Sequence, residues 1–217
     1  MRALGSIRTP RGLLCLAGAV WALLLLGAFL VQPSDALFTA QSTVPANTFT
    51  TASCFAGNTG LLSPAAQAAD TSAGNGDGYE LNPAGAFASG GSFATDVGSG
   101  GDRHRYYNYN ISIPAGCSIK GIVVRIDWWL SNTSGNSSMG IELSWNSGTS
   151  YTAAKTDAVM TTTQHTALLG GSTDLWGRTW TVAETSNANF RVRVTDNNTT
   201  LPDFMLDWIP VQVYYGP

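Results

Sequence analysis

"SIKGIVVRIDWWL", residues 118–130, is the stretch that decides the fold of this 217-residue chain. Its apolar side chains recur at every second position: Ile122, Val124, Ile126, Trp128 and Leu130. Successive side chains of a β-strand point to opposite faces, so this period of two predicts a long strand with one face in a core. The opposite face would carry the residues between them: Val123, Arg125, Asp127 and Trp129.

The same alternation recurs elsewhere in the second half of the chain. We expect inward-facing side chains in three further stretches: Met139, Ile141, Leu143 and Trp145; Phe190, Val192 and Val194; and Ile209, Val211, Val213 and Tyr215. A strand over 105–113 would place a fourth set on one face: Tyr107, Tyr109, Ile111 and Ile113. Two short strands are expected near 78–82 and 92–96. Pro210 should lie at an edge or a bulge, because proline cannot donate to a strand ladder.

Turn-rich segments such as "SNTSGNSS" (131–138) separate these stretches, and nothing beyond residue 36 shows sustained helical spacing. Short strands joined by turns predict two stacked antiparallel sheets. We therefore expect an all-β sandwich, jelly-roll or immunoglobulin-like, preceded by an N-terminal signal or transmembrane helix. The expected segments are a signal peptide or membrane anchor (1–36), an extended arm (37–56), a Gly/Ala/Ser-rich loop region with short strands (57–102) and the sandwich body (103–217).

The first 36 residues have the order of an export signal, with basic residues first, then an apolar run at 13–31, then small residues. Ser34 and Ala36 favour cleavage between Ala36 and Leu37. Because the apolar run is also long enough to span a bilayer, an uncleaved anchor is the alternative.

The composition is typical of an extracellular protein. The chain has 11 Lys and Arg against 14 Asp and Glu; removing residues 1–36 leaves 8 basic against 13 acidic residues, a net charge of −5. This balance provides no basic patch for nucleic acid or an anionic membrane.

After cleavage only two cysteines, Cys54 and Cys117, remain. We expect them to form a disulfide in an oxidising compartment, with two free buried thiols as the alternative.

The junction "ALFTAQSTVPANTFTTASC", residues 36–54, resembles that of the TasA/camelysin group of exported proteins, whose signals are cut by a SipW-type peptidase. The resemblance rests on the two ends of the stretch: Ala36, Phe38 and Thr39, and Asn47 to Thr50. Ala40 and Ala46 depart from the pattern, which has Asp and commonly Gly there. The resemblance implies a surface or biofilm-matrix protein, and some members polymerise by passing an N-terminal strand to a neighbour. The body resembles a β-sandwich module of bacterial and phage-encoded secreted proteins.

An extended arm could act as such a donor strand, because the edge of an open sheet presents unpaired N–H and C=O groups. The side chains that would fill the neighbour's pockets are Leu37 or Phe38, Val44 and Phe49. Alternatively, the same arm forms the first strand of its own sandwich.

Two features indicate ligand sites. Trp129 faces away from Trp128 and is the candidate platform on which a sugar ring could stack, although packing explains most of the other aromatic residues. The loop "DTSAGNGDGYE" (70–80) offers four oxygen ligands for a structural Ca²⁺: Asp70, Asn75, Asp77 and Glu80. Their spacing departs from the EF-hand loop, so a turn without metal is the alternative. The sequence predicts no other cofactor.

No catalytic set is visible, so we expect a protein that is not an enzyme. His104 and His165 are far apart and lack a hydrolase or metalloprotease motif. Asp127 and Glu142 could face each other as a glycosidase pair on adjacent strands, but their outward positions favour solvated ion pairs, for Asp127 with Arg125.

The resulting expectation is an exported, non-enzymatic surface or extracellular-matrix subunit that associates with itself or with other surface proteins. A carbohydrate-binding module with a polysaccharide partner is the alternative. Contact with a membrane would be limited to the N-terminal segment.

Overall fold

Strand β5, Ser118–Leu130, is the centre of the first of two sheets. The structure is a computed structural model that describes residues 53–98, 100–198 and 202–217. All five apolar side chains of the expected inner face of β5 are fully buried. Strands β10 (Phe204–Trp208) and β11 (Val211–Gly216) pair with one edge of β5, and β8 (His165–Gly170) pairs with the other.

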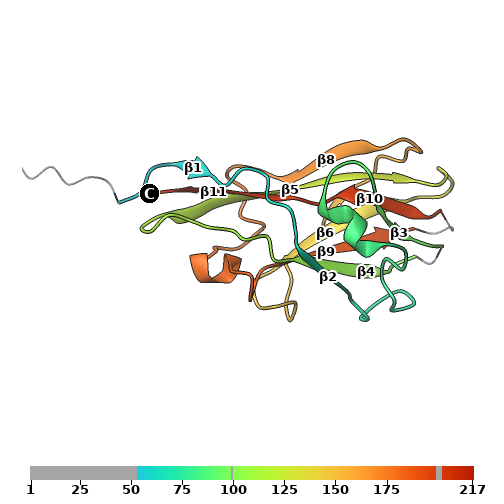
Figure 1. Ribbon diagram of the computed structural model, residues 1–217, viewed down its shortest axis with the longest axis horizontal. Helices are drawn as coiled ribbons and strands as arrows, with labels where there is room; N and C mark the ends of the chain where they lie inside the picture. Colours follow the sequence, from blue (N-terminus) through green and yellow to red (C-terminus); the bar gives the residue numbers. More distant parts are fainter. Residues whose placement is uncertain (1–52, 99, 199–201) are drawn as a thin grey trace, which may run out of the picture. The chain divides into compact units, whose positions relative to one another are not determined.

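The two sheets form a β-sandwich in which every strand pairing is antiparallel, as expected (Figure 1). The first sheet has the order β1-β11-β5-β10-β3, with β8 also on β5; β1 is Gly57–Asn58 and β3 is Ala94–Asp96. The second has the order β2-β4-β9-β6-β7. Its strands are β2 (Ala66–Ala69), β4 (Arg103–Tyr107), β6 (Ser138–Ser144), β7 (Lys155–Asp157) and β9 (Arg191–Asn197). Two short 3₁₀ helices, η2 (Pro83–Phe87) and η3 (Val182–Thr185), complete the fold.

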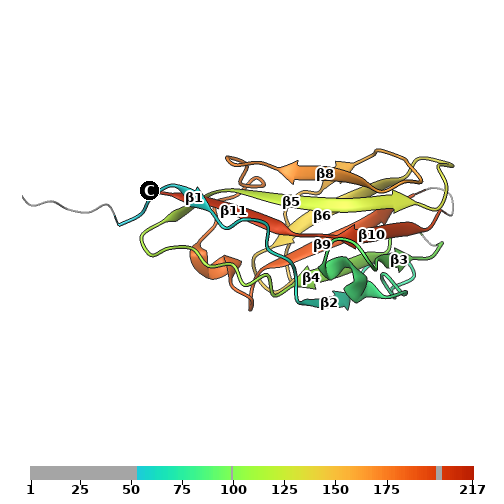
Figure 2. The ribbon, with the colours of Figure 1, turned by 45° about the horizontal axis from the view of Figure 1, so that its top comes forward.

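The core lies between the two sheets, which Figure 2 shows as stacked layers. Most of the expected inward-facing residues are at most 1% exposed: Met139, Ile141, Leu143, Phe190, Val192, Val194, Ile209, Val211 and Val213. Trp145 and Tyr215 are only partly buried.

A polar contact also links the sheets, because the Nε1–H of Trp128 donates to Asp157 (2.8 Å) and Nε2 of His165 lies 2.7 Å from the same carboxylate. The indole therefore has the hydrogen-bond partner that burial demands.

The expected strand over 105–113 is wrong in extent and in facing. Strand β4 ends at Tyr107, and Tyr106 is buried while Tyr107 is only partly so. Asn108 and Asn110 have φ of 61° and 55°, the left-handed region that interrupts a strand and that asparagine tolerates. Tyr109 is nevertheless buried, with its hydroxyl donating to the carbonyl of Ile209 (3.1 Å).

Two other expected strands also differ from the structure. Residues 78–82 form no strand; only Leu81 makes an isolated bridge, to Thr95 in β3. The last expected stretch, with Ile209, Val211, Val213 and Tyr215 on one face, is interrupted, because β10 ends at Trp208, β11 begins at Val211 and Pro210 lies in the gap between them. The carbonyl of Pro210 accepts from the N–H of Arg125 (3.0 Å), so proline occupies an irregular position where no donor is needed.

Cys54 and Cys117 form the expected disulfide, with Cα atoms 5.1 Å apart. It joins the residues before β1 to the start of β5. The arm residues Leu37, Phe38, Val44 and Phe49, and the cleavage site at Ala36 and Leu37, lie outside the described residues. Within the described ranges no helix is long and apolar enough to cross a membrane.

Replacing both cysteines by serine should lower the free energy of unfolding by about 4 kcal/mol, because the bridge closes a 63-residue loop that limits the freedom of the unfolded chain. Urea denaturation of wild type and of Cys54→Ser/Cys117→Ser would measure the difference. A reductant should destabilise the wild type and leave the variant unchanged. Equal midpoints for the two proteins under oxidising conditions would contradict the expectation.

Candidate functional site

The outer face of the second sheet carries two rows of arginine and tyrosine side chains. In the pairing of β4 with β9, Arg105 is opposite Arg193 and Tyr107 is opposite Arg191. Residues between them on the same strands, such as Tyr106, are buried in the core. Alternation therefore directs all four of these side chains outward.

Three of these side chains, those of Arg105, Tyr107 and Arg191, line a cavity of about 180 Å³, which we call the arginine groove; Ala68 and Ser147 complete its lining. Ala68 pairs with Arg105 across β2 and β4, and its small side chain leaves room above the strand. Ser147 belongs to the turn after β6. The next residue, Gly148, has φ of 90°, and a Cβ there would lie 3.1 Å from Nη1 of Arg105, so glycine lets the turn approach the groove closely.

The two arginines of the groove are held differently. Arg191 stacks on the ring of Tyr107 (4.4 Å) and donates to the hydroxyl of Ser147 and to three main-chain carbonyls, those of Asn187, Ala188 and Phe190. The Nη2–H of Arg105 donates to the carbonyl of Ala69 (2.9 Å), but its buried Nε–H has no hydrogen-bond partner in the described part of the chain. The guanidinium of Arg191 is thus held by hydrogen bonds to four groups, whereas that of Arg105 makes one hydrogen bond among the described residues.

The charges in the groove are not balanced. Among the described residues, neither Arg105 nor Arg191 forms an ion pair, whereas the adjacent Arg193 pairs with Asp70 (3.1 Å) and Glu142 (2.7 Å). Burial is the main cause of a lowered pKa of Arg191, and the like charge of Arg105 lowers this pKa further. A bound anion would relieve that repulsion, so the groove is suited to a carboxylate or a similar group.

Trp129 lies on the outer face of the first sheet, as expected, and is partly buried. Phe93 packs edge-on against its ring, with centroids 4.9 Å apart, and Met205 is its cross-strand neighbour on β10. Phe93 and Leu81 are each about half exposed. Together these four residues, Leu81, Phe93, Trp129 and Met205, form an apolar patch that we call the Trp129 patch. It lies on a different sheet from the arginine groove.

The four expected calcium ligands of the loop 70–80 do not converge. Asp70 pairs with Arg193, and Asn75 accepts from the N–H of Asp77 within the loop. Glu80 accepts from the N–H of Val97 (2.9 Å). In the described part of the chain the carboxylates that do come together are those of Asp96, Asp102 and Asp196, which no sequence motif marks. The available signal was the alternation itself, which places Asp196 two residues after the buried Val194.

The remaining candidates have structural partners. His104 is buried; its Nδ1 accepts from the N–H of Tyr79 (3.1 Å), its Nε2 lies 2.6 Å from Gln67, and burial lowers its pKa to about 4. Asp127 and Glu142 belong to different sheets, so they cannot face each other on adjacent strands. Asp127 does pair with Arg125 (2.8 Å), but this carboxylate is 1% exposed rather than solvated.

No protein-family model matches the chain, and a search of curated proteins gives no match. Among solved structures, the chain is similar to the CBM32 module of AlyQ in complex with 4,5-unsaturated mannuronic acid, with a TM-score of 0.36 and 12% identity over 70% of this chain and 96% of that one. It is also similar to truncated AlyQ with CBM32 and alginate lyase domains (TM-score 0.34, 11% identity, 74% of this chain and 34% of that one). A third is the CBM22-1–GH10 part of Clostridium thermocellum xylanase 10B with xylohexaose (TM-score 0.32, 14% identity, 72% and 25%).

The neutral state of His104 should make stability depend on pH. The unfolded chain binds a proton near pH 6.5 while the folded chain resists it down to about pH 4, so the contribution is complete above pH 6.5 and is lost as the pH falls. Between pH 7 and 4.5 the loss should be about 2–3 kcal/mol. Urea denaturation at both values should show a smaller loss for His104→Gln than for wild type, and an equal loss would contradict this assignment.

Proposed function

We propose that this protein is an exported, non-catalytic module that binds an acidic polysaccharide in the arginine groove. The observation that carries the proposal is the pair of guanidinium groups, Arg105 and Arg191, which face one cavity without an acidic partner among the described residues. On the same sheet face the neighbouring Arg193 has two acidic partners, Asp70 and Glu142, and the groove arginines have no such partner among the described residues.

A uronic acid residue provides the groups that the groove lacks. Its carboxylate can accept from the guanidinium groups of Arg105 and Arg191, which line the cavity, and hydrogen bonds between guanidinium and carboxylate are about twice as strong as neutral ones. Its hydroxyl groups can bond to Ser147 and to the phenol of Tyr107. A cavity of about 180 Å³ is smaller than a typical site for a drug-sized ligand, so it suits one sugar unit of a longer chain that continues across the open sheet.

The charge of the surroundings favours a saccharide over a nucleic acid. The chain carries a net charge of −3, and the carboxylates of Asp70 and Glu142 lie on the same sheet face as the groove. A nucleic acid, with a phosphate at every nucleotide, requires an extended basic surface. A polyuronate needs only one positive site per bound sugar.

Export is consistent with this partner. The disulfide between Cys54 and Cys117 is typical of oxidising compartments, where polysaccharides of cell walls and matrices are found. The N-terminal segment has the order of an export signal. The Trp129 patch is a second surface on which a sugar ring could stack, as the sequence indicates.

Isothermal titration calorimetry should detect binding of polygalacturonate or alginate oligosaccharides and none of neutral mannan. Arg105→Gln should weaken the affinity roughly 10- to 100-fold, because it removes a charged hydrogen-bond donor. Arg103→Gln is the matched control: Arg103 lies two residues earlier on the same face of β4, outside the groove, and its loss should leave the affinity unchanged. Added salt should weaken binding by the wild type.

Failure of the wild type to bind any uronate would contradict the proposal. Equal losses in Arg103→Gln and Arg105→Gln would show that the effect is one of overall charge. A loss of binding in Trp129→Ala with full binding in Arg105→Gln would transfer the site to the Trp129 patch, and the arginine groove would then be the wrong assignment.

The hypothesis of a matrix subunit that polymerises by donating its N-terminal arm stays a prediction. The donor residues lie outside the described residues. Among the described edge strands, β2, β3 and β7 are short, with four, three and three residues, whereas β8, with six residues paired only to β5, offers a longer edge to an incoming strand. Electron microscopy of the purified protein would reveal filaments if the hypothesis is right.

A further inference from the structure

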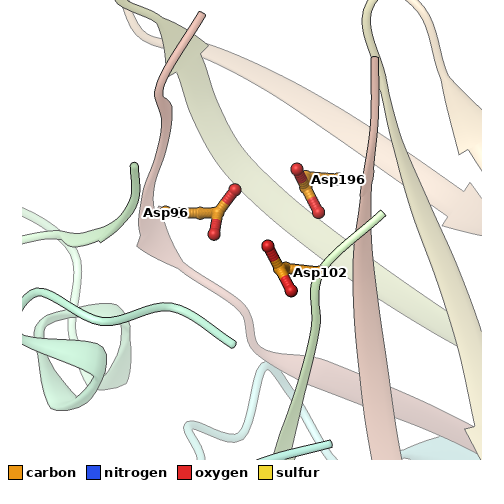
Figure 3. A group of neighbouring side chains, drawn as sticks. All are labelled: Asp96, Asp102 and Asp196. Carbon is orange, nitrogen blue, oxygen red and sulfur yellow. The ribbon is translucent and has the colours of Figure 1, made fainter. Parts of the chain in front are cut away.

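Three aspartates meet between the two sheets, two of them close in sequence and the third about a hundred residues further along the chain. Asp96 ends β3 of the first sheet, Asp102 immediately precedes β4, and Asp196 lies in β9 of the second sheet. Each offers a carboxylate oxygen within 4.8 Å of the others. Figure 3 shows the three side chains directed toward one another.

All three side chains are buried, and two of them accept no hydrogen bond from the rest of the described chain. Asp102 accepts from the N–H groups of Asn75 (2.8 Å) and Gly76 (3.2 Å). By contrast, no other residue in the described ranges donates to the four carboxylate oxygens of Asp96 and Asp196, although both residues are 0% exposed; the two carboxyl groups lie against each other. Buried charged groups are normally paired or bound to a metal, because an uncompensated charge in the interior is strongly destabilising.

A fourth buried group next to the cluster also lacks a partner. Tyr79 is 1% exposed, and its hydroxyl has no hydrogen-bond partner in the described ranges. Of the charged groups that act on this hydroxyl, Asp196 and Asp96 are the strongest. Unsatisfied polar atoms at one place in a core are rare in native proteins and indicate a missing ion or water.

We propose that Asp96, Asp102 and Asp196 bind one calcium ion between the sheets. Ca²⁺ takes oxygen ligands at about 2.3–2.6 Å, so two of its ligands lie at most about 5 Å apart, and the oxygens of the cluster, all within 4.8 Å of one another, satisfy this limit. Mg²⁺ demands a near-ideal octahedron and usually keeps several of its waters, which suits a buried site between two sheets less well. Water would supply further ligands, and the Tyr79 hydroxyl would hydrogen-bond to such a water.

The ion would connect elements that the main chain leaves separate. Asp96 belongs to the first sheet, while Asp102 immediately precedes β4 of the second sheet and Asp196 lies in the adjacent strand β9. A cation bound to all three therefore cross-links the sandwich at one end. The loop 70–80 packs against the same site through Asn75 and Gly76, so calcium would also order this loop. This inference is independent of sugar binding.

Calcium binding to the chelator-treated full chain can be measured by calorimetry and by thermal unfolding. A Ca²⁺ concentration 100 times the Kd should raise Tm by roughly 5–10 °C, because the ion binds only the folded state. Asp96→Asn and Asp196→Asn should lose the binding heat and the Tm shift at the concentration that saturates the wild type. Asp77→Asn is the matched control, because Asp77 is an exposed carboxylate in the loop 70–80 outside the cluster, and it should respond as the wild type does.

The wild type alone can overturn the inference, even if the cluster variants fail to fold. No binding heat and no Tm shift up to about 10 mM Ca²⁺, above the Kd of weak extracellular sites, would show that protons rather than a metal neutralise the cluster. A response to Mg²⁺ but not to Ca²⁺ would refute calcium as the ion. Loss of the response in Asp77→Asn would place the site elsewhere.

Discussion

Stacking of the two inner sheet faces is the constraint on which the rest of the structure depends. Every second side chain of each paired strand must enter the space between the sheets, and the five fully buried residues of β5 fill its middle. A slip of one residue in the pairing would exchange the buried and exposed faces of a strand, so the apolar core determines the register. The register in turn decides which polar groups face solvent and which are buried.

Strands β4 and β9 show most clearly how the register sorts polar groups, because arginines lie on their outer face and aspartates lie at inward positions near one end. Arg105 and Arg191 point outward into the arginine groove. Two inward positions near one end of the same pair of strands are Asp102 and Asp196, at the aspartate cluster. A cation in the cluster would stiffen the strands that carry the groove, and a rigid site loses less entropy when a ligand binds.

The sequence was sufficient for the sandwich and for much of its core. Uninterrupted alternation predicted the faces of β5, β6 and β9 correctly, because a period of two leaves only one way to bury the apolar set. It failed after Tyr107, where Asn108 and Asn110 turn the backbone into the left-handed region. Pro210 was predicted at an irregular position, although the break that it makes between β10 and β11 was not.

The candidate sites required information that one sequence does not contain. The arginine groove exists because β4 pairs with β9, strands more than eighty residues apart, and alternation along each strand says nothing about that pairing. The aspartate cluster likewise joins Asp96 and Asp102, which are close in sequence, to Asp196 of the distant strand β9. For the loop 70–80, composition alone suggested calcium, but Asp70 and Glu80 have other partners; the loop reaches the cluster through the main-chain N–H groups of Asn75 and Gly76 and through the Tyr79 hydroxyl. The location of both sites therefore depends on which strands pair and in which register, and residue type alone does not reveal it.

The central proposal is that an acidic polysaccharide binds to the outer face of β4 and β9. An NMR titration of the ¹⁵N-labelled protein with a uronate oligosaccharide tests it most directly, because each backbone amide reports its own surroundings. The account predicts that the largest shift changes fall on the residues of the arginine groove, Arg105, Tyr107, Ser147 and Arg191. Changes centred on Phe93 and Trp129, or no changes at saturating sugar, would contradict it.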